Sequence, residues 1–281
     1  MTITRRSIGW IVYHTLIIAF GILMIYPVLW MISGSFKTNY EILNESLKLL
    51  PDSFSFQYFK QGWKGFGKLT FATFFSNSFQ ITILATLGTT VSSSLIAYAF
   101  ARIKFPGRKV LFICMISTMM LPAQIVMIPQ YIVFNKMGFV NSYIPLILPH
   151  WFGSAFFTFM MMQFIQALPI EMDEAAIIDG CSRYSVYTRI ILPLISPALI
   201  TTIIIQFYWK WEDFMGPLIY LSRPAKYPVS LAIKLFSDSS STTDYGPMFA
   251  MSTLSLLPVF LIFLFFNRQL IQGISTSGLK A

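Results

Sequence analysis

The stretch EMDEAAIIDGCSRYSVYTRIILP, residues 171–193, contrasts with the rest of the chain. Only 11% of the 281 residues are charged, yet Glu171, Asp173, Glu174 and Asp179 fall within nine positions. Long uncharged runs lie on both sides of this stretch. A short acidic segment between two apolar runs indicates a loop that leaves an apolar medium and returns to it.

The composition of the whole chain identifies that medium as a membrane. Hydrophobic residues make up 56% of the chain, and the mean hydropathy is +0.67. A soluble domain cannot bury so much apolar surface. Six uncharged runs each supply the ~20 residues that a helix needs to cross a ~30 Å hydrocarbon core. We therefore predict one all-α, polytopic membrane domain over residues 1–281, with six transmembrane helices at about 10–32, 77–101, 110–132, 143–166, 192–213 and 247–267.

The expected orientation rests on arginine. If both termini lie on one side, lysine and arginine together number ten on each side, but seven arginines share the side of the termini and only Arg223 is opposite. An excess of basic residues marks the cytoplasmic side, so we expect cytoplasmic termini. The net charge of +9 is explained by basic residues that hold helix ends against membrane lipid. Nucleic acid is not an expected partner.

Enzymatic chemistry has little support in this sequence. GWKGFGKL, residues 62–69, matches a phosphate-binding loop up to Lys68, but Leu69 stands where Ser or Thr would hold Mg²⁺. Cys114 and Cys181 have no metal or redox spacing. A membrane-embedded enzyme would need clustered His, Asp, Glu or Ser at one depth, and the predicted spans offer scattered polar residues. We expect no catalytic residue and no metal site.

A stand-alone secondary carrier or channel is the main alternative. Coupling to protons or sodium ions usually needs ionisable groups near the bilayer midplane. The runs show His14, near the start of the first span. A lone histidine there is more typical of an interfacial residue than of a proton relay. The composition therefore favours an external source of energy.

The opening stretch predicts two short helices joined at a glycine. The acids at its start suit the positive end of a helix dipole, and Gly180 fits just past a helix C-terminus. Ser182 suits the cap of a second helix, to about residue 192, which Pro193 and Pro197 would bend into the fifth span. We expect this elbow to expose its acidic face to a partner outside the membrane.

The spacing within the elbow is specific. Glu174-Ala175-Ala176, three residues, Gly180, nine residues and Ile190-x-Leu192-Pro193 give the pattern EAA-x3-G-x9-I-x-LP. It resembles the signature loop of the permease subunits of bacterial ABC importers, in which a coupling helix docks in a cleft of the ATPase subunit. The alternative is an amphipathic linker that lies on the membrane surface. The resemblance implies that loop 167–193 is cytoplasmic and that its ATPase-coupling residues are Glu171, Glu174, Ala175, Ala176, Asp179, Gly180, Arg183, Ile190, Leu192 and Pro193.

Two further stretches, WKWEDFMGPLIYL at 209–221 and residues 249–281, resemble the shorter permease of carbohydrate importers of the maltose type. This resemblance implies the type I ABC importer permease fold in a bacterial inner membrane. It implies a second, homologous permease, two ATPase subunits that bind ATP and Mg²⁺, an extracytoplasmic sugar-binding protein and an oligosaccharide substrate. The chain itself would carry no cofactor.

Candidates for the substrate path cluster at YWKWEDF, residues 208–214. Aromatic rings offer flat faces to sugars and carboxylates accept from hydroxyl pairs, although an ordinary aromatic belt would look similar. The candidates are Tyr208, Trp209, Lys210, Trp211, Glu212 and Asp213. The stretches GPLIYL and YPVSLAIKLF resemble those of permeases for uronic-acid oligosaccharides, such as those derived from alginate or pectin. A surplus of three basic residues on the outer side suits such an anionic substrate.

Overall fold

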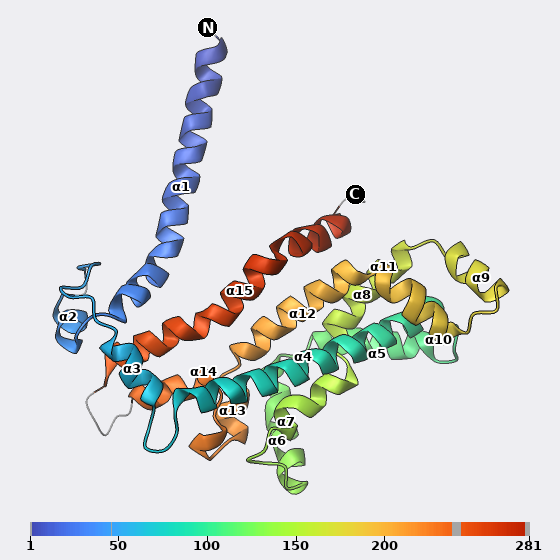
Figure 1. The fold of residues 1–281 in the computed structure, drawn as a ribbon. Coiled ribbons are helices and arrows are strands. Elements are labelled where there is room, and N and C mark those ends of the chain that lie inside the picture. The colour runs from blue at the N-terminus through green and yellow to red at the C-terminus, as the bar shows by residue number, and fades with distance from the viewer. Residues whose placement is uncertain (1, 46, 238–242, 279–281) are drawn as a thin grey trace. The chain divides into compact units, whose positions relative to one another are not determined.

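The computed structural model describes residues 2–45, 47–237 and 243–278, and within these ranges the regular elements are helices (Figure 1). The predicted all-α fold is confirmed. The chain divides into two units. The first comprises Met1–Phe71 and Ile233–Leu257, and the second comprises Ala72–Ala232 and Pro258–Ala281.

The first unit joins segments from both ends of the chain. Gly34 lies so close to Phe249 that an added Cβ would come within 2.9 Å of the ring, and Trp30 packs edge-on to the same ring at 5.2 Å. The side chain of Asn39 accepts a hydrogen bond from the Tyr245 N–H at 3.0 Å. The helices of this unit are α1 (Thr2–Gly34), α2 (Asn39–Asn44), α3 (Gln57–Lys64), η4 (Ile233–Ser237) and the part of α15 (Tyr245–Gly278) up to Leu257.

A capping box fixes the start of α2, in the polar segment that follows the first long helix. Thr38 and Glu41 each accept a hydrogen bond from the other's backbone N–H. The Glu41 carboxylate also accepts from the Asp52 N–H at 2.9 Å. These donors, Asp52 first and then Thr38, lower the pKa of Glu41 from 4.5 to about 2. These hydrogen bonds hold the segment after the first long helix in a defined conformation.

The second unit is arranged around α4 (Phe71–Arg102). The buried side chains of α4 include small polar residues such as Thr86, Thr89 and Ser93. Gly88 lets the Trp151 ring approach so closely that an added Cβ would lie 2.7 Å from it. Small side chains allow such close packing of helices. The other elements are α5 (Arg108–Met119), α6 (Ala123–Lys136), α7 (Ile144–Ile147), η1 (Leu148–Phe152), α8 (Ala155–Ala167), α9 (Glu171–Ile178), α10 (Arg183–Val186), the π-helical turn η2 (Tyr187–Ile191), α11 (Leu192–Leu194), α12 (Ser196–Trp211), α13 (Met215–Tyr220), η3 (Pro224–Lys226) and α14 (Val229–Ala232).

Four of the six predicted spans correspond to stretches that are long and apolar enough to cross a membrane. The other two are bent pairs of helices, so the count reaches six if each pair is one span. The four stretches are Gly9–Gly34, Phe71–Arg102, Ile144–Ala167 and Tyr245–Phe266.

The bent pairs correspond to the spans expected at 110–132, where Pro122 and Pro129 predict a kink or an early end, and at 192–213. α5 and α6 meet at 104°, and Pro122, which cannot donate a backbone hydrogen bond, precedes α6. At 1.5 Å per residue, α5 and α6 are about 18 and 21 Å long, too short to cross alone. α12 begins at Ser196 after a bend of 75°, so residues 192–194 belong to the elbow and not to the fifth span.

Candidate functional site

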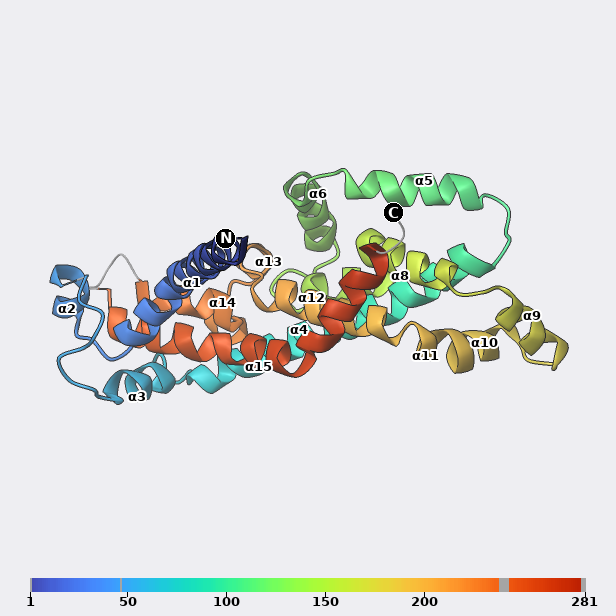
Figure 2. The same ribbon diagram turned by 90° about the horizontal axis from the view of Figure 1, so that it is seen from above.

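The elbow predicted from the sequence forms at one end of the second unit, where α9 and α10 lie beyond α8 and α12 (Figures 1 and 2). α9 ends in a Schellman motif: the Cys181 N–H donates to the Ala176 carbonyl at 2.9 Å and the Gly180 N–H to the Ile177 carbonyl at 3.0 Å. Gly180 has a φ of +84°. An added Cβ there would meet nothing within 4 Å, so backbone conformation and not space requires the glycine. Ser182 then caps α10 by accepting from the Ser185 N–H.

The predicted coupling residues divide between two faces of the elbow. Ala176, Ile190 and Leu192 face inward, toward a core cluster that includes Met161 and Ile165 of α8. Ala176 is only 8% exposed, which differs from the expectation that it faces a partner: its small size suits packing within the chain. The exposed members are Glu171, Glu174, Ala175, Asp179, Gly180, Arg183 and Pro193.

The outward face of α9 combines acids with exposed apolar side chains. Glu171, Glu174, Ala175 and Ile178 follow the i, i+3, i+4, i+7 spacing that places residues on one side of a helix. Ile178 is 85% exposed, and Tyr184 on α10 is 71% exposed. Exposed apolar groups with a charged rim are typical of surfaces that bind another protein.

A buried ion pair, which the sequence analysis missed, fixes the inner side of α9 to the end of α4. Arg102 Nε lies 3.2 Å from Asp173 Oδ2, and the two side chains are 8% and 9% exposed. Arg102 Nη2 also donates to the Leu168 carbonyl at 2.8 Å. Asp173 lies three residues before the inward-facing Ala176, so the helical period would have identified it as the inward acid.

Two further hydrogen bonds join the elbow to α4. The Tyr187 hydroxyl lies 2.8 Å from Ser94 Oγ, and the Tyr98 hydroxyl donates to the Arg183 carbonyl at 3.2 Å. The rings of Tyr98 and Tyr187 also pack together at 5.2 Å. With the ion pair, these contacts make the elbow and the last turns of α4 one connected structure.

The substrate-path candidates at the end of α12 are divided by their contacts. Lys210 Nζ donates to Asp213 Oδ2 at 2.7 Å, and Asp213 Oδ1 accepts from the Gly216 N–H at 2.9 Å. Trp211 is buried and stacks on Phe207 at 5.6 Å. Lys210, Trp211 and Asp213 therefore hold the turn into α13.

The remaining three candidates, Tyr208, Trp209 and Glu212, are exposed. The Trp209 ring also packs against Phe156 and Phe157 of α8, at 5.6 and 5.4 Å. Tyr208 and Glu212, one turn apart, are thus the candidates that these contacts leave most accessible to a ligand.

His150 is the centre of a polar cluster that the sequence analysis overlooked. Its Nδ1 lies 3.2 Å from both Thr89 Oγ1 of α4 and Gln206 Nε2 of α12. Its carbonyl accepts from Ser92 Oγ at 3.2 Å. The signal was a second histidine within the uncharged run 137–170. Among the described residues, no group of three or more His, Cys, Asp or Glu side chains could hold a metal ion.

Residues 93–276 match the family described as the inner membrane component of binding-protein-dependent transport systems. The chain belongs to that family. This permease is thus an integral inner membrane protein, in agreement with its apolar helices. The matched region contains the elbow, His150 with Gln206, and the end of α12, while Thr89 and Ser92 lie just before it.

Relatives cover nearly the whole permease. The arabinooligosaccharides transport system permease AraQ of Bacillus subtilis is 31% identical over 92% of this chain and 92% of its own length. The diacetylchitobiose uptake system permease NgcG of Streptomyces coelicolor is 27% identical over 93% of this chain and 86% of its own. A probable ABC transporter permease of B. subtilis, YurM, is 29% identical over 91% and 83%.

Solved structures confirm the predicted importer fold. A bacterial ABC transporter involved in the import of the acidic polysaccharide alginate aligns over 93% of this permease and 96% of its own chain, with a TM-score of 0.82 and 20% identity. A bacterial alginate transporter in complex with an alginate pentasaccharide-bound periplasmic protein aligns over 92% and 93%, with a TM-score of 0.65 and 18% identity. At this level of identity the likeness shows the fold alone.

Proposed function

We propose that this permease is the translocation subunit of an ATP-driven, binding-protein-dependent importer of oligosaccharides. The observation that carries the proposal is the elbow: it combines the EAA spacing with an outward face of acids and exposed apolar residues, outside the predicted spans. The names of relatives such as AraQ and NgcG support an oligosaccharide as the substrate class.

In this proposal the elbow is cytoplasmic and a separate ATPase subunit docks on it. The permease pairs with a second, homologous permease, and two ATPase subunits bind ATP and Mg²⁺ outside this chain. An extracytoplasmic binding protein delivers the oligosaccharide. With six spans, a cytoplasmic elbow between the fourth and fifth also places both termini in the cytoplasm.

The proposed role of the elbow is mechanical. When the ATPase moves the elbow, the buried pair of Arg102 with Asp173 and the contacts of Tyr98 and Tyr187 pass the movement to α4. Packed elements have discrete arrangements and do not deform continuously. In this proposal a movement of the elbow therefore shifts α4, whose buried polar residue Thr89 lies beside His150 and Gln206.

Co-purification tests the docking surface. Ile178→Asp places a charge on the most exposed apolar residue of α9, and we expect the permease to lose the soluble ATPase while remaining in the membrane fraction. Leu47→Asp, at an apolar position that is 91% exposed in the polar segment before α3, is the matched control and should retain the ATPase. Equal ATPase recovery from both variants would overturn the docking assignment.

A further inference from the structure

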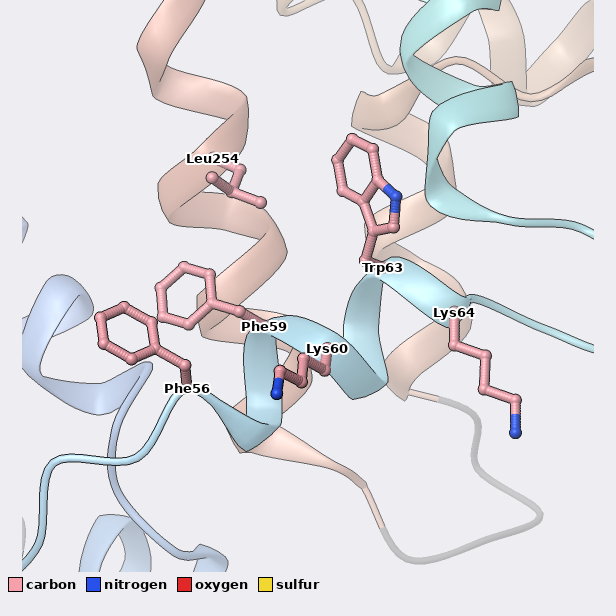
Figure 3. Close-up of a pocket in the computed structure, with 6 residues that line it drawn as sticks. All are labelled: Phe56, Phe59, Lys60, Trp63, Lys64 and Leu254. Atoms are coloured by element: carbon pink, nitrogen blue, oxygen red, sulfur yellow. The ribbon is translucent and has the colours of Figure 1, made fainter.

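A second feature lies in the first unit, where α3 packs beside α15 and forms a pocket of about 560 Å³ (Figure 3). The pocket is lined by Phe56, Phe59, Lys60, Trp63, Lys64 and Leu254. Figure 3 shows the rings of Phe59 and Trp63 on the side of Leu254, while the ammonium groups of Lys60 and Lys64 point away from it. The walls of this pocket are therefore apolar and its positive charges lie at the edge.

The sequence of α3 produces this division. Phe59 and Trp63 are four residues apart, as are Lys60 and Lys64, so each pair forms a stripe along the helix. α3 contains no acidic residue. A helix with aromatic residues on one face and lysines on the other is typical of a helix that lies in the membrane interface.

Close contacts with α15 place α3 beside the first turns of a candidate membrane span. An added Cβ at Gly62 would lie 2.8 Å from the Met251 side chain, and one at Gly246 would lie 2.6 Å from the Tyr58 ring. α3 therefore lies along the first turns of Tyr245–Phe266, a candidate span. Leu254 is about 14 Å along the helix axis from Tyr245. The pocket thus extends from the interface into the region of the acyl chains.

The chemistry of the lining selects the ligand. A sugar site needs several polar groups that fix the orientation of its hydroxyls, but this lining offers two ammonium groups, an indole N–H and otherwise carbon. An amphiphile with a negative head group needs an apolar slot with cations at its edge. We propose that the pocket binds an anionic phospholipid of the adjoining leaflet: an acyl chain lies against Phe59, Trp63 and Leu254, and Lys60 and Lys64 bind the phosphate.

Native mass spectrometry of the full-length permease tests the proposal. We expect phosphatidylglycerol to bind at least fivefold more tightly than phosphatidylcholine with the same acyl chains. The double variant Lys60→Gln/Lys64→Gln should lose this preference. The control Lys68→Gln/Lys104→Gln removes two positive charges elsewhere and should keep it. Equal binding of the two lipids to the wild type, or equal loss of preference in both double variants, would overturn the site.

A second measurement follows the acyl chain and remains informative if the lysine variants alter folding. Phosphatidylglycerol with brominated acyl chains should quench tryptophan fluorescence, and Trp63→Phe should remove part of the quenched signal. Unchanged quenching in Trp63→Phe would contradict the acyl-chain assignment. A uronic-acid oligosaccharide is the other anion to compare. If it bound in a Lys60- and Lys64-dependent way while phosphatidylglycerol did not, the pocket would be a sugar site.

Discussion

At the scale of single residues, Asp173 and Asp179 differ in what their carboxylates contact. Asp173 is buried against Arg102, whereas Asp179 is exposed at the end of α9. Removing one partner of a buried pair leaves the other charge uncompensated, at a cost of about 3–5 kcal/mol. Asp173→Asn should therefore loosen the elbow, measured as faster amide hydrogen exchange over residues 171–180. Asp179→Asn, the matched control, should leave exchange unchanged.

The double variant Arg102→Met/Asp173→Leu tests whether this buried site needs the two charges or only well-packed side chains. Replacing a buried pair by apolar residues of similar volume is often neutral, so we expect slow exchange to return in this variant. If this double variant also had the ATPase stimulation by substrate that the wild-type complex shows, the pair would be needed only for packing. If the elbow were protected but stimulation remained low, the ion pair itself would take part in coupling.

Gly180 gives a second prediction at this scale. A β-branched residue in the left-handed conformation costs about 1–2 kcal/mol or more, while Asn tolerates it. Because an added Cβ has open space, the cost comes from the backbone alone. Gly180→Val should leave the permease inserted and reduce uptake severalfold, whereas Gly180→Asn should retain most uptake. Normal uptake by Gly180→Val would contradict the capping argument.

At the scale of elements, the two faces of α9 differ in burial, and we expect them to have separate roles. Ala175 is exposed and Ala176 is buried against the core cluster. Ala175→Trp should weaken ATPase co-purification without changing the thermal stability of the permease. Ala176→Trp should overpack the core, at a cost of about 1–3 kcal/mol, and lower thermal stability as well. If both variants had the same stability, the assignment of the two faces would be wrong.

Local patterns in the sequence predicted some elements well and others poorly. The end of α9 followed from Gly180 and the start of α10 from Ser182, because caps depend on neighbouring residues. Pro122 predicts a kink or an early end of the third span, but the angle of 104° between α5 and α6 did not follow, because tertiary packing sets it. The inward turn of Ala176 and the pairing of Arg102 with Asp173 depend on contacts between distant segments. Composition alone does not specify such contacts.

At the scale of the whole molecule, α4 links the elbow with the loop after α13 in the second unit. Its 32 residues correspond to about 48 Å. Near its start, Asn77 donates to the carbonyls of Ala225 and Tyr227, and Ser78 accepts from the Val229 N–H. Arg102, its last residue, is paired with α9. One continuous helix therefore connects the elbow with the loop that follows α13.

The charge of the substrate is the last prediction. The loops predicted to lie on the outer side carry more bases than acids, although neighbouring carboxylates pair with Lys48 and Lys210. A positive field raises the local concentration of an anion, and salt screens it over ~8 Å at physiological ionic strength. We expect a uronic-acid oligosaccharide to stimulate the ATPase of the assembled complex, with its binding protein, more than a neutral one of equal length. The difference should shrink as salt is added.

Variants of α3 sharpen this measurement. Because the phosphate of the phospholipid proposed above would already offset the charges of Lys60 and Lys64, Lys60→Gln/Lys64→Gln should leave the preference for the uronide intact. Arg223→Gln, in the loop after α13 that α4 holds through Asn77, should reduce it. A preference for the neutral sugar would remove the charge argument and leave the importer proposal standing, because the proposed docking of the ATPase depends on the elbow at the other end of α4.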